Sequence, residues 1–496
     1  MQPELWAIGG RSAVDPGPVC ARAFHRLLAL VSLSAWLSLG TQLDVLVGSH
    51  GLLPAVDFFT RAREHGLGVL DVPSWLWLGQ SDALLTCGVL LGALTSLLAL
   101  FGFGTRVAFA CNAVLYLGYA IACDTFTSFQ WDNMLVEASL LAALLPRDRR
   151  APLATLLLRL LLFKLYFESG IAKWQSQIGD WKDGSAMSYY YETAPLPTWL
   201  AWYAHYLPVS VHRLESWAAL IMELVVPWFV FGPRALRLIA FAYFGGFLLV
   251  DTLTANYGFF TYLAAALQVF LLCDADLERL AGFVRERLPA WFRDPRAESE
   301  PAARALPPWA AKLARGALAL YACVWIASSL IGAVTHFTTF ASQHEAVMRA
   351  YLASEPFRHA NVYHLFGQIT RERIEPSFET EVDGTWVEHP LLYKPGPPTR
   401  PPPFVAPHQP RVDFRLWFYG LSFQQGMPRF VRALLDRLCH DPTAVQSLFT
   451  NSLPAHAEAA RIVFHRYHFT TASERAATGA YWTRESLGAT QPFACH

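Results

Sequence analysis

The sequence predicts a mainly α-helical membrane protein, in which a polytopic bundle of about nine spans is followed by a C-terminal soluble α+β domain. Of its 496 residues, 54% are hydrophobic and only 16% are charged, which is too apolar for a soluble chain of this length. Nine segments are apolar over roughly the 17–25 residues that a helix needs to cross a bilayer. Residues 340–496, by contrast, are polar, rich in proline and without any such segment.

The predicted bundle occupies residues 25–334 and follows a polar segment, 1–24. Its candidate spans lie near residues 25–43, 83–103, 106–123, 130–146, 152–169, 215–232, 236–253, 257–273 and 313–334. The first span lacks a small-residue cleavage pattern, so we expect a retained anchor. Gly88 and Gly92 form a GxxxG pattern in the second span, which predicts close packing against a neighbour.

Arginines mark alternate connections between these spans. They occur at Arg22 and Arg26, at Arg106, at Arg147, Arg149 and Arg150, at Arg234 and Arg237, and in the loop from Arg279 to Lys312. Short loops rich in Lys and Arg stay in the cytoplasm. We therefore expect 1–24 to be cytoplasmic, and the segments around 44–81, 123–130, 170–214 and everything after about 335 to be extracytoplasmic.

The tail, residues 340–496, predicts both strands and helices. Asp383-Gly384 separates two alternating segments, which indicates a β-hairpin. IVFHRYHFTT also alternates and predicts a strand, whereas FVRALLDRL has helical spacing. Asp441-Pro442 is typical of the cap and first position of a further short helix.

Carboxylates and bases interrupt the apolar segments 130–146 and 152–169. In an antiparallel hairpin of these two helices, Asp132 would lie level with Lys164, and Glu137 level with Arg159. An isolated charge near the bilayer centre costs about 2.5–3.5 kcal/mol on insertion scales, so pairing across the helices is expected. Five residues correspond to about 140° of rotation, so both pairs cannot face the neighbouring helix.

Further polar residues extend this pattern beyond the hairpin. Glu168 is one helical turn from Lys164, and Glu223 precedes Pro227 by four residues. Together they predict either an ion-pair network that holds the bundle in register, or a polar cavity that binds a client segment, a lipid or a small molecule. The candidate residues are Asp132, Glu137, Arg159, Lys164, Glu168, Lys173, Trp174, Glu192, His205, Glu223, Asn256, Tyr257, His408 and Arg411.

The external segment 170–214 is dense in Trp and Tyr, as in DWKDGSAMSYYYETAPLPTWLAWYAHYLP. Amphipathic rings favour the headgroup level of a membrane, where the ring contacts lipid and the N–H or hydroxyl stays hydrated. The segment therefore predicts a re-entrant or surface-lying element. An aromatic docking surface for a partner protein is the alternative.

Several classes of function are excluded by composition. Lys+Arg and Asp+Glu number 39 each, which leaves no basic excess for nucleic acid. The eight cysteines form no CxxC, and His465 and His468 fall on opposite faces of the predicted strand, so we expect neither metal nor cofactor. Cys439 and Cys495 could form a disulfide in an oxidising compartment. The absence of an N-x-S/T sequon favours a bacterial source.

These residues also carry a resemblance to a known family, the lipase maturation factors. The similar stretches are FQWDNMLVEASLL, FKLYFESGIAKW, YYYETAPLPTWLAWYAHYLP, FGPRALR, ANYGFF, DGTW, YKPG and APHQPRVDFRLWF. They run in family order from about residue 120 to the end, whereas the preceding part is similar only in hydropathy. The positions shared with these motifs are Asp132, Glu137, Lys164, Lys173, Trp174, Glu192, Pro195, Pro197, His205, Glu223, Asn256, Tyr257, Pro407, His408, Gln409, Pro410 and Arg411.

The resemblance implies a multi-pass membrane protein of the endoplasmic reticulum which, in animals, helps homodimeric lipases fold and assemble. A bacterial-type member would lie in the cytoplasmic membrane, and its client is not implied. Two hypotheses follow: a membrane-anchored factor for secreted lipases or similar clients, or an integral-membrane enzyme distantly similar to vitamin K-dependent carboxylase. Transport is poorly supported, because no inverted repeat is evident. Membrane lipid is the other expected partner.

Overall fold

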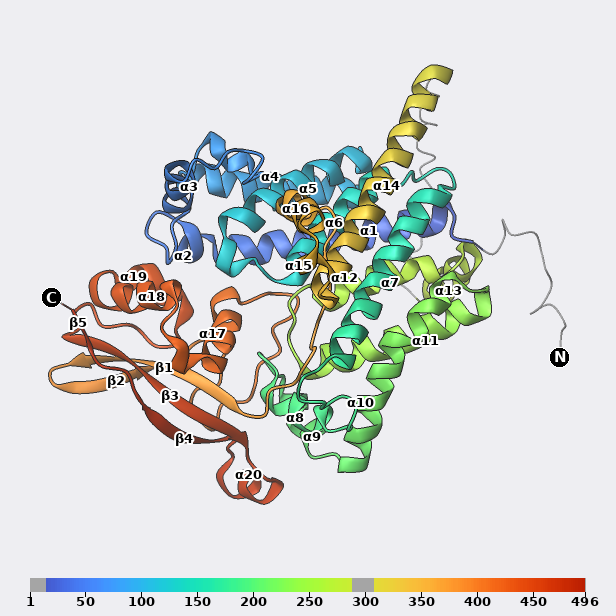
Figure 1. Ribbon diagram of the computed structural model, residues 1–496. Helices are drawn as coiled ribbons and strands as arrows, with labels where there is room; N and C mark the ends of the chain where they lie inside the picture. The colour runs from blue at the N-terminus through green and yellow to red at the C-terminus, as the bar shows by residue number, and fades with distance from the viewer. Residues whose placement is uncertain (1–14, 288–306, 496) are drawn as a thin grey trace.

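A computed structural model describes residues 15–287 and 307–495 of the chain. It shows a helical bundle with a smaller sheet domain packed against one of its ends (Figure 1). The helices before the sheet domain are α1 (Pro18–Gly40), α2 (Leu43–Val47), α3 (Ala55–Glu64), α4 (Asp82–Phe101), α5 (Thr105–Ala122), α6 (Gln130–Leu144), α7 (Pro152–Trp174), α8 (Ala186–Thr193), α9 (Trp199–His205), α10 (Val209–Leu224), α11 (Arg234–Thr254), α12 (Phe260–Leu267), α13 (Asp274–Arg287), α14 (Pro308–Phe337), α15 (Phe340–Gln343) and α16 (Glu345–Ser354). Short 3₁₀ turns lie at Trp75–Leu78, Asp124–Phe126, Val226–Phe231, Gln268–Leu271 and Glu355–Phe357.

All nine predicted spans coincide with helical segments. In the part of the chain that the structure describes, six are long and apolar enough to cross a membrane: α1, α4, α5, Val209–Phe231, α11 and α14. A seventh is possible if the bent pair Phe260–Leu271 and Asp274–Phe283 counts as one span. Of the two remaining helices, α6 has only 15 residues, and α7 carries Arg159, Lys164, Glu168 and Lys173. These two helices hold six of the charged candidate residues: Asp132 and Glu137 on α6, and Arg159, Lys164, Glu168 and Lys173 on α7.

The predicted arginine regions meet at one end of the bundle. Arg22 donates to the carbonyl of Arg147, and Arg147 donates to Thr105 Oγ1 at 3.0 Å. Arg106 reaches Ala143 O, and Arg234 pairs with Asp276. Residues 1–14 of the predicted cytoplasmic segment and 288–306 of the arginine-rich loop lie outside the described residues. Asp15, just before α1, joins these regions, because Arg150 donates to its carbonyl and Arg237 to its carboxylate. The beginning of α1 lies on the side of the bundle away from the sheet domain (Figure 1).

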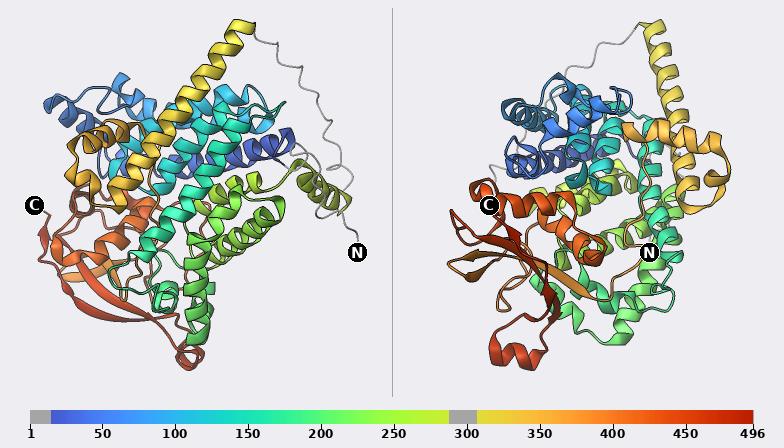
Figure 2. Two further views of the ribbon diagram at one scale, coloured as in Figure 1. Left: turned by 45° about the vertical axis from the view of Figure 1, so that its right-hand side comes forward. Right: turned by 60° about the vertical axis from the view of Figure 1, so that its left-hand side comes forward.

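The C-terminal domain is an antiparallel sheet in the order β2-β1-β3-β4, with β5 pairing a further part of β3. Helices pack against it, as Figure 2 shows. Its elements are β1 (Arg373–Val382), β2 (Thr385–His389), α17 (Arg411–Leu421), α18 (Arg429–His440), α19 (Pro442–Val445), β3 (Ala459–Phe469), α20 (Ala472–Thr478), β4 (Trp482–Ala489) and β5 (Phe493–Ala494), with 3₁₀ turns at Phe423–Gln425 and Gln446–Leu448.

The local predictions for the tail are confirmed. Asp383 and Gly384 have positive φ angles of 49° and 69°, as the tight hairpin between β1 and β2 requires. IVFHRYHFTT lies largely in β3, FVRALLDRL in α18, and Pro442 begins α19. Cys439 of α18 and Cys495, next to β5, form a disulfide.

Helix α17 lies directly on the sheet because of one glycine. A Cβ on Gly420 would stand 2.1 Å from the carbonyl oxygen of Ile374 in β1, so only glycine permits this approach. The contact fixes α17 between the sheet and the bundle. Arg411, the first residue of α17, reaches Asp132 of the bundle.

Candidate functional site

Asp132 of α6 pairs with Arg411 of α17, and both side chains are 0% exposed. The guanidinium donates to the two carboxylate oxygens at 2.9 and 3.1 Å, and Tyr116 OH donates to the carboxylate at 2.6 Å. The predicted partner, Lys164, is therefore wrong. The prediction considered only bases on α7, whereas the partner of Asp132 comes from α17 of the other domain.

Glu137 of α6 pairs with Lys164 at 3.1 Å, not with the predicted Arg159. It also accepts hydrogen bonds from the backbone and side chain of Asn361 and from Tyr363 OH. On α7, the partner of Glu137 is thus Lys164 rather than Arg159, a shift of five residues, which is more than one helical turn. Arg159 instead donates to Phe270 O and lies 3.5 Å from Asp15.

A segment between α16 and β1 crosses the N-terminal part of α6 and the C-terminal part of α7, which we call the outer ends of these helices. We call residues 361–369 the strap. Side chains of the bundle accept hydrogen bonds from five backbone N–H groups of the strap. These bonds are Asn361 to Glu137 Oε2, 3.0 Å; Tyr363 to Glu168 Oε2, 2.8 Å; His364 to Gln130 Oε1, 2.8 Å; Leu365 to Ser169 Oγ, 3.3 Å; and Ile369 to Asp180 Oδ2, 2.7 Å. The acids of the bundle thus bind the main chain of the strap.

Lys173 of α7 also contacts the strap. Its ammonium lies 2.6 Å from Glu223 of α10 and donates to the strap carbonyl of Leu365 at 2.9 Å. The preceding Gly170 is in close contact with α10, since a Cβ there would lie 2.8 Å from the backbone of Glu223. Trp174, the neighbouring candidate, is 53% exposed and is not part of the strap contacts described above.

The aromatic segment 170–214 docks the other side of the C-terminal domain. Glu192 of α8 accepts from Phe469 N at 2.7 Å and from His468 Nδ1 at 3.1 Å, with His205 3.9 Å away. Trp202 donates its indole N–H to Thr470 O at 2.8 Å. Part of the predicted aromatic docking surface therefore holds this chain's own β3.

The ETAPLP turn after α8 is held by two buried bases of the sheet domain. Arg373 donates to the carbonyls of Glu192, Ala194 and Pro195, and it pairs with Glu375 at 2.6 Å. Lys394 pairs with the same Glu375 at 2.8 Å. The carbonyls at the end of α8 thus gain the donors that a helix terminus lacks.

Asn256 joins this turn to the proline-rich segment. Its amide donates to Leu196 O and Pro403 O, and its carbonyl accepts from Val405 N and Ala406 N. All four hydrogen-bonding positions of one buried side chain are therefore used.

Two further candidates lie beside Asn256. Tyr257 OH lies 3.0 Å from Tyr190 OH, which donates to Asp251 at 2.6 Å. His408 Nδ1 lies 3.0 Å from Ser38 Oγ of α1. Contacts between the bundle and the C-terminal domain or strap involve eight of the fourteen candidates, so most of them belong to one joint between the bundle and the C-terminal region. These eight are Asp132, Glu137, Glu168, Lys173, Glu192, Asn256, His408 and Arg411.

Burial dominates the electrostatics on the sheet side of this joint. It lowers the pKa of His408 to about 4, assisted by the charge of Arg411. It lowers the pKa of Lys394 to about 8, although Glu375 opposes the shift. It raises the pKa of Asp413 to about 6, against the backbone hydrogen bond from Tyr393.

Several residues of the joint escaped the sequence reasoning. Asn361, Tyr363 and Arg373 are as deeply engaged as the predicted acids, but no motif or periodic pattern distinguishes them. The only available signal was indirect: buried acids in the bundle exceed the bases on neighbouring helices, so external donors are needed. Among the described residues, no group of three His, Cys, Asp or Glu side chains is arranged to hold a metal ion.

Comparison with known proteins agrees with this two-part architecture. Residues 19–279 match the lipase maturation factor transmembrane domain, and residues 359–492 match the lipase maturation factor C-terminal domain. The chain belongs to the lipase maturation factor family. The first match covers over half of the chain, and the second begins just before the strap. The joint therefore connects the two conserved modules of the family.

Relatives with curated names align over nearly the whole chain. Lipase maturation factor 2 of Homo sapiens is 28% identical over 93% of this chain and 80% of its own length. Lipase maturation factor 1 of Bos taurus is also 28% identical, over 93% of this chain and 86% of its own. No solved structure matches the chain.

Proposed function

We propose that this chain is a membrane-anchored folding or maturation factor that assists secreted lipases or similar client proteins. Membership of the lipase maturation factor family supports the client class. The comparisons do not favour the alternative, an integral-membrane enzyme. The observation that carries the proposal is the joint: the polar residues of the bundle are occupied by the chain's own strap and C-terminal domain, which they hold in a fixed position.

The proposed topology places the C-terminal domain outside the cytoplasm. The arginine regions meet at the opposite end of the bundle, and the positive-inside rule puts that end in the cytoplasm. The Cys439–Cys495 disulfide fits an oxidising compartment. The membrane would be the endoplasmic reticulum in a eukaryote and the cytoplasmic membrane in a bacterium.

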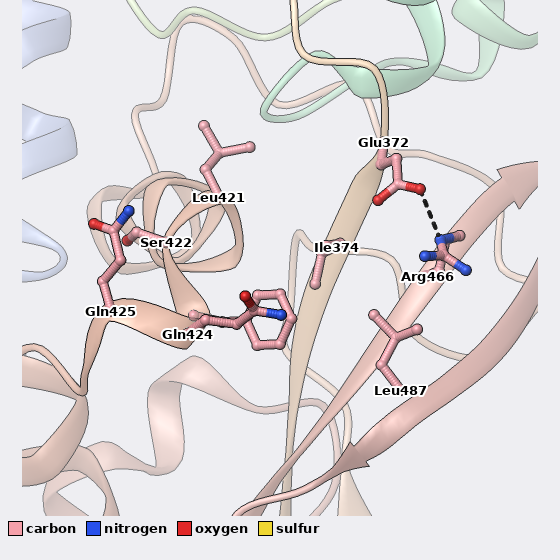
Figure 3. A pocket seen from close by; sticks show the side chains of 9 residues that line it. Glu372, Ile374, Leu421, Ser422, Gln424, Gln425, Arg466 and Leu487 are labelled. Atoms are coloured by element: carbon pink, nitrogen blue, oxygen red, sulfur yellow. Dashed lines mark ion pairs between the residues drawn. The ribbon is translucent and has the colours of Figure 1, made fainter.

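A cavity on the C-terminal domain is the surface that we assign to client contact. It measures about 400 Å³ and lies between the end of α17 and the strands β1, β3 and β4 (Figure 3). Ile374, Leu421, Phe423 and Leu487 provide apolar lining. The charged residue Arg466 is already paired with Glu372 and Glu485, so neutral segments of a client are favoured there.

The test is co-expression with a secreted lipase and measurement of secreted lipase activity per lipase molecule. We expect the wild-type chain to raise this specific activity. Leu421→Asp, which places a charge in the cavity, should lower the gain severalfold at unchanged abundance. The matched control is Leu352→Asp on α16, which is 58% exposed and does not line the cavity. Equal gains with both variants would remove the cavity from the proposal, and no gain with wild type would contradict the function itself.

The Lys164→Met variant distinguishes a structural role of the Lys164–Glu137 ion pair from a catalytic role of Lys164. Removing the ammonium leaves Glu137 buried with neutral donors only, so protein abundance and maturation activity should fall together. Normal abundance with abolished function would instead favour the enzyme alternative. Quantitative immunoblotting beside the lipase assay distinguishes these results.

A further inference from the structure

Two histidines face each other where the strap meets the outer end of α14. The rings of His364 in the strap and His336 in α14 are stacked, with centroids 4.1 Å apart and planes inclined by 14°. Such stacking is stable for neutral imidazoles. When both rings are protonated, two positive charges stand at this distance and repel each other.

A second contact requires His364 to be neutral. Gln130 of α6 accepts the backbone N–H of His364 through Oε1, and this fixes the orientation of its amide. The amide nitrogen then faces His364 Nδ1 at 3.1 Å, so Nδ1 must accept the hydrogen bond. Protonation of Nδ1 would set two donors against each other. The pKa of His364 is accordingly lowered, first by burial and then by His336.

The backbone of the strap region is strained on both sides of this pair. Arg358 and Phe366 have positive φ angles of 49° and 53°, which bulky side chains rarely adopt. Arg358 caps the 3₁₀ turn Glu355–Phe357 before the strap, so Phe366 is the residue that would relax if the strap left the bundle. The bound strap is thus a conformation that depends on its side-chain contacts.

The charged groups on the packed elements already have partners. Glu137 of α6 is paired with Lys164 of α7, and Glu168 and Lys173 of α7 bind the strap backbone. His359, the other histidine near the strap, contacts Ser328 of α14. Among the described residues, neither His364 nor His336 forms an ion pair with a carboxylate that would stabilise the protonated pair.

We propose that the stacked His336–His364 pair is an acid-sensitive latch, which holds the strap against the bundle while both rings are neutral and releases it when they are protonated. The release is local. It frees the backbone N–H groups of the strap while the sheet domain keeps its fold. The device goes beyond the maturation role and does not depend on the identity of the client.

Hydrogen exchange of the full-length protein in lipid nanodiscs tests the latch. Protection of the strap amides is compared at pH about 7.5 and about 5.5, after correction for the intrinsic pH dependence of exchange. We expect strap protection to fall about tenfold or more at the lower pH, while the amides of β3 keep theirs. An equal loss in β3 would mean global acid unfolding and would overturn the proposal.

Three variants make the result specific. The double variant His336→Phe with His364→Phe keeps the ring stack without titratable nitrogens, so strap protection should no longer change with pH. His336→Phe alone retains the Gln130 contact and should show a reduced change, which serves if the double variant folds poorly. The control is His344→Phe on α15, whose ring stacks on Phe340 rather than on a histidine. The latch would be overturned if strap protection changed with pH as in wild type both in the double variant and in His336→Phe. It would also be overturned if strap protection in the wild-type protein did not change with pH.

Discussion

Asp132 and Glu137 are excluded from solvent and receive donors from residues more than 200 positions further along the chain. A buried carboxylate is tolerated only when charge and hydrogen bonds compensate its lost hydration. Here Arg411 and the strap provide that compensation. The two acids are therefore docking residues for the C-terminal region, which explains their presence in an apolar setting.

Replacing one partner should reveal this role. We expect Arg411→Met to destabilise the protein by about 3–5 kcal/mol, because Asp132 keeps its charge in a buried position. Thermal unfolding in detergent, together with the yield of folded protein, measures the loss. The double variant Asp132→Leu with Arg411→Met should be milder, and Arg429→Met on α18, at an exposed position, should be neutral. A mild single variant would contradict the assignment.

His408 should make stability depend on pH. Its pKa is about 4 in the folded protein against 6.5 for an unperturbed histidine. Between these values the unfolded chain binds the proton and the folded chain does not, so this contribution to stability is lost as the pH falls from 6.5 toward 4.

His408→Gln removes the titrating group but retains hydrogen-bonding capacity toward Ser38. The melting temperature of the variant should decline less steeply over this pH range than that of wild type. Parallel curves for the two proteins would show that His408 is not the titrating group.

At the level of elements, α7 connects the two domains. Its inner half lies among the other helices, and its outer half presents Lys164, Glu168 and Lys173 to the strap. Close contact with α10 at Gly170 brings Glu223 within reach of Lys173. The packing of one helix pair thus positions the last charge of the joint.

Gly170→Ala tests this contact. The added methyl group would lie 2.8 Å from the α10 backbone, so the helices must separate and the Lys173–Glu223 pair should weaken. We expect lower thermal stability, with a loss of about 1–3 kcal/mol in the free energy of unfolding, as is typical of overpacking. Gly246→Ala in α11 is the control, because its Cβ would meet no atom within 4 Å. Equal melting temperatures for the two variants would refute the tight contact.

At the scale of the whole molecule, the chain has two ends of different chemistry. Arginine-bearing turns gather at one end of the bundle, and the sheet domain covers the other (Figure 1). The external segments predicted from the arginine pattern contact that domain, for example Thr125 and Ser128 through Arg415, and His50 through Asp441. The fold is therefore consistent with one membrane orientation throughout.

A reporter fused after residue 340 checks this orientation. A reporter that folds only outside the cytoplasm should be active there, and the same reporter fused after residue 150, beside the arginine turn, should be inactive. Activity at 150 and inactivity at 340 would invert the topology and with it the proposed location of the client surface.

Features that depend on nearby residues could be predicted from the amino-acid sequence alone. The nine helical segments, the hairpin at Asp383-Gly384 and the helix beginning at Pro442 follow from hydropathy, periodicity and turn chemistry, which act over a few positions. The family motifs also contain Asp132, Glu137, Glu192 and Arg411 of the joint, whereas Asn361, Tyr363 and Arg373 lie outside them.

The contacts of those residues, by contrast, depend on how the helices and the two domains pack. The predicted pairs Asp132–Lys164 and Glu137–Arg159 assumed that neighbours in sequence are neighbours in space. The true partner of Asp132 arrives from the other domain, and the offset between α6 and α7 moves Lys164 to Glu137. Such pairings depend on how whole helices and domains pack, and a charged residue carries no local signal that names its partner.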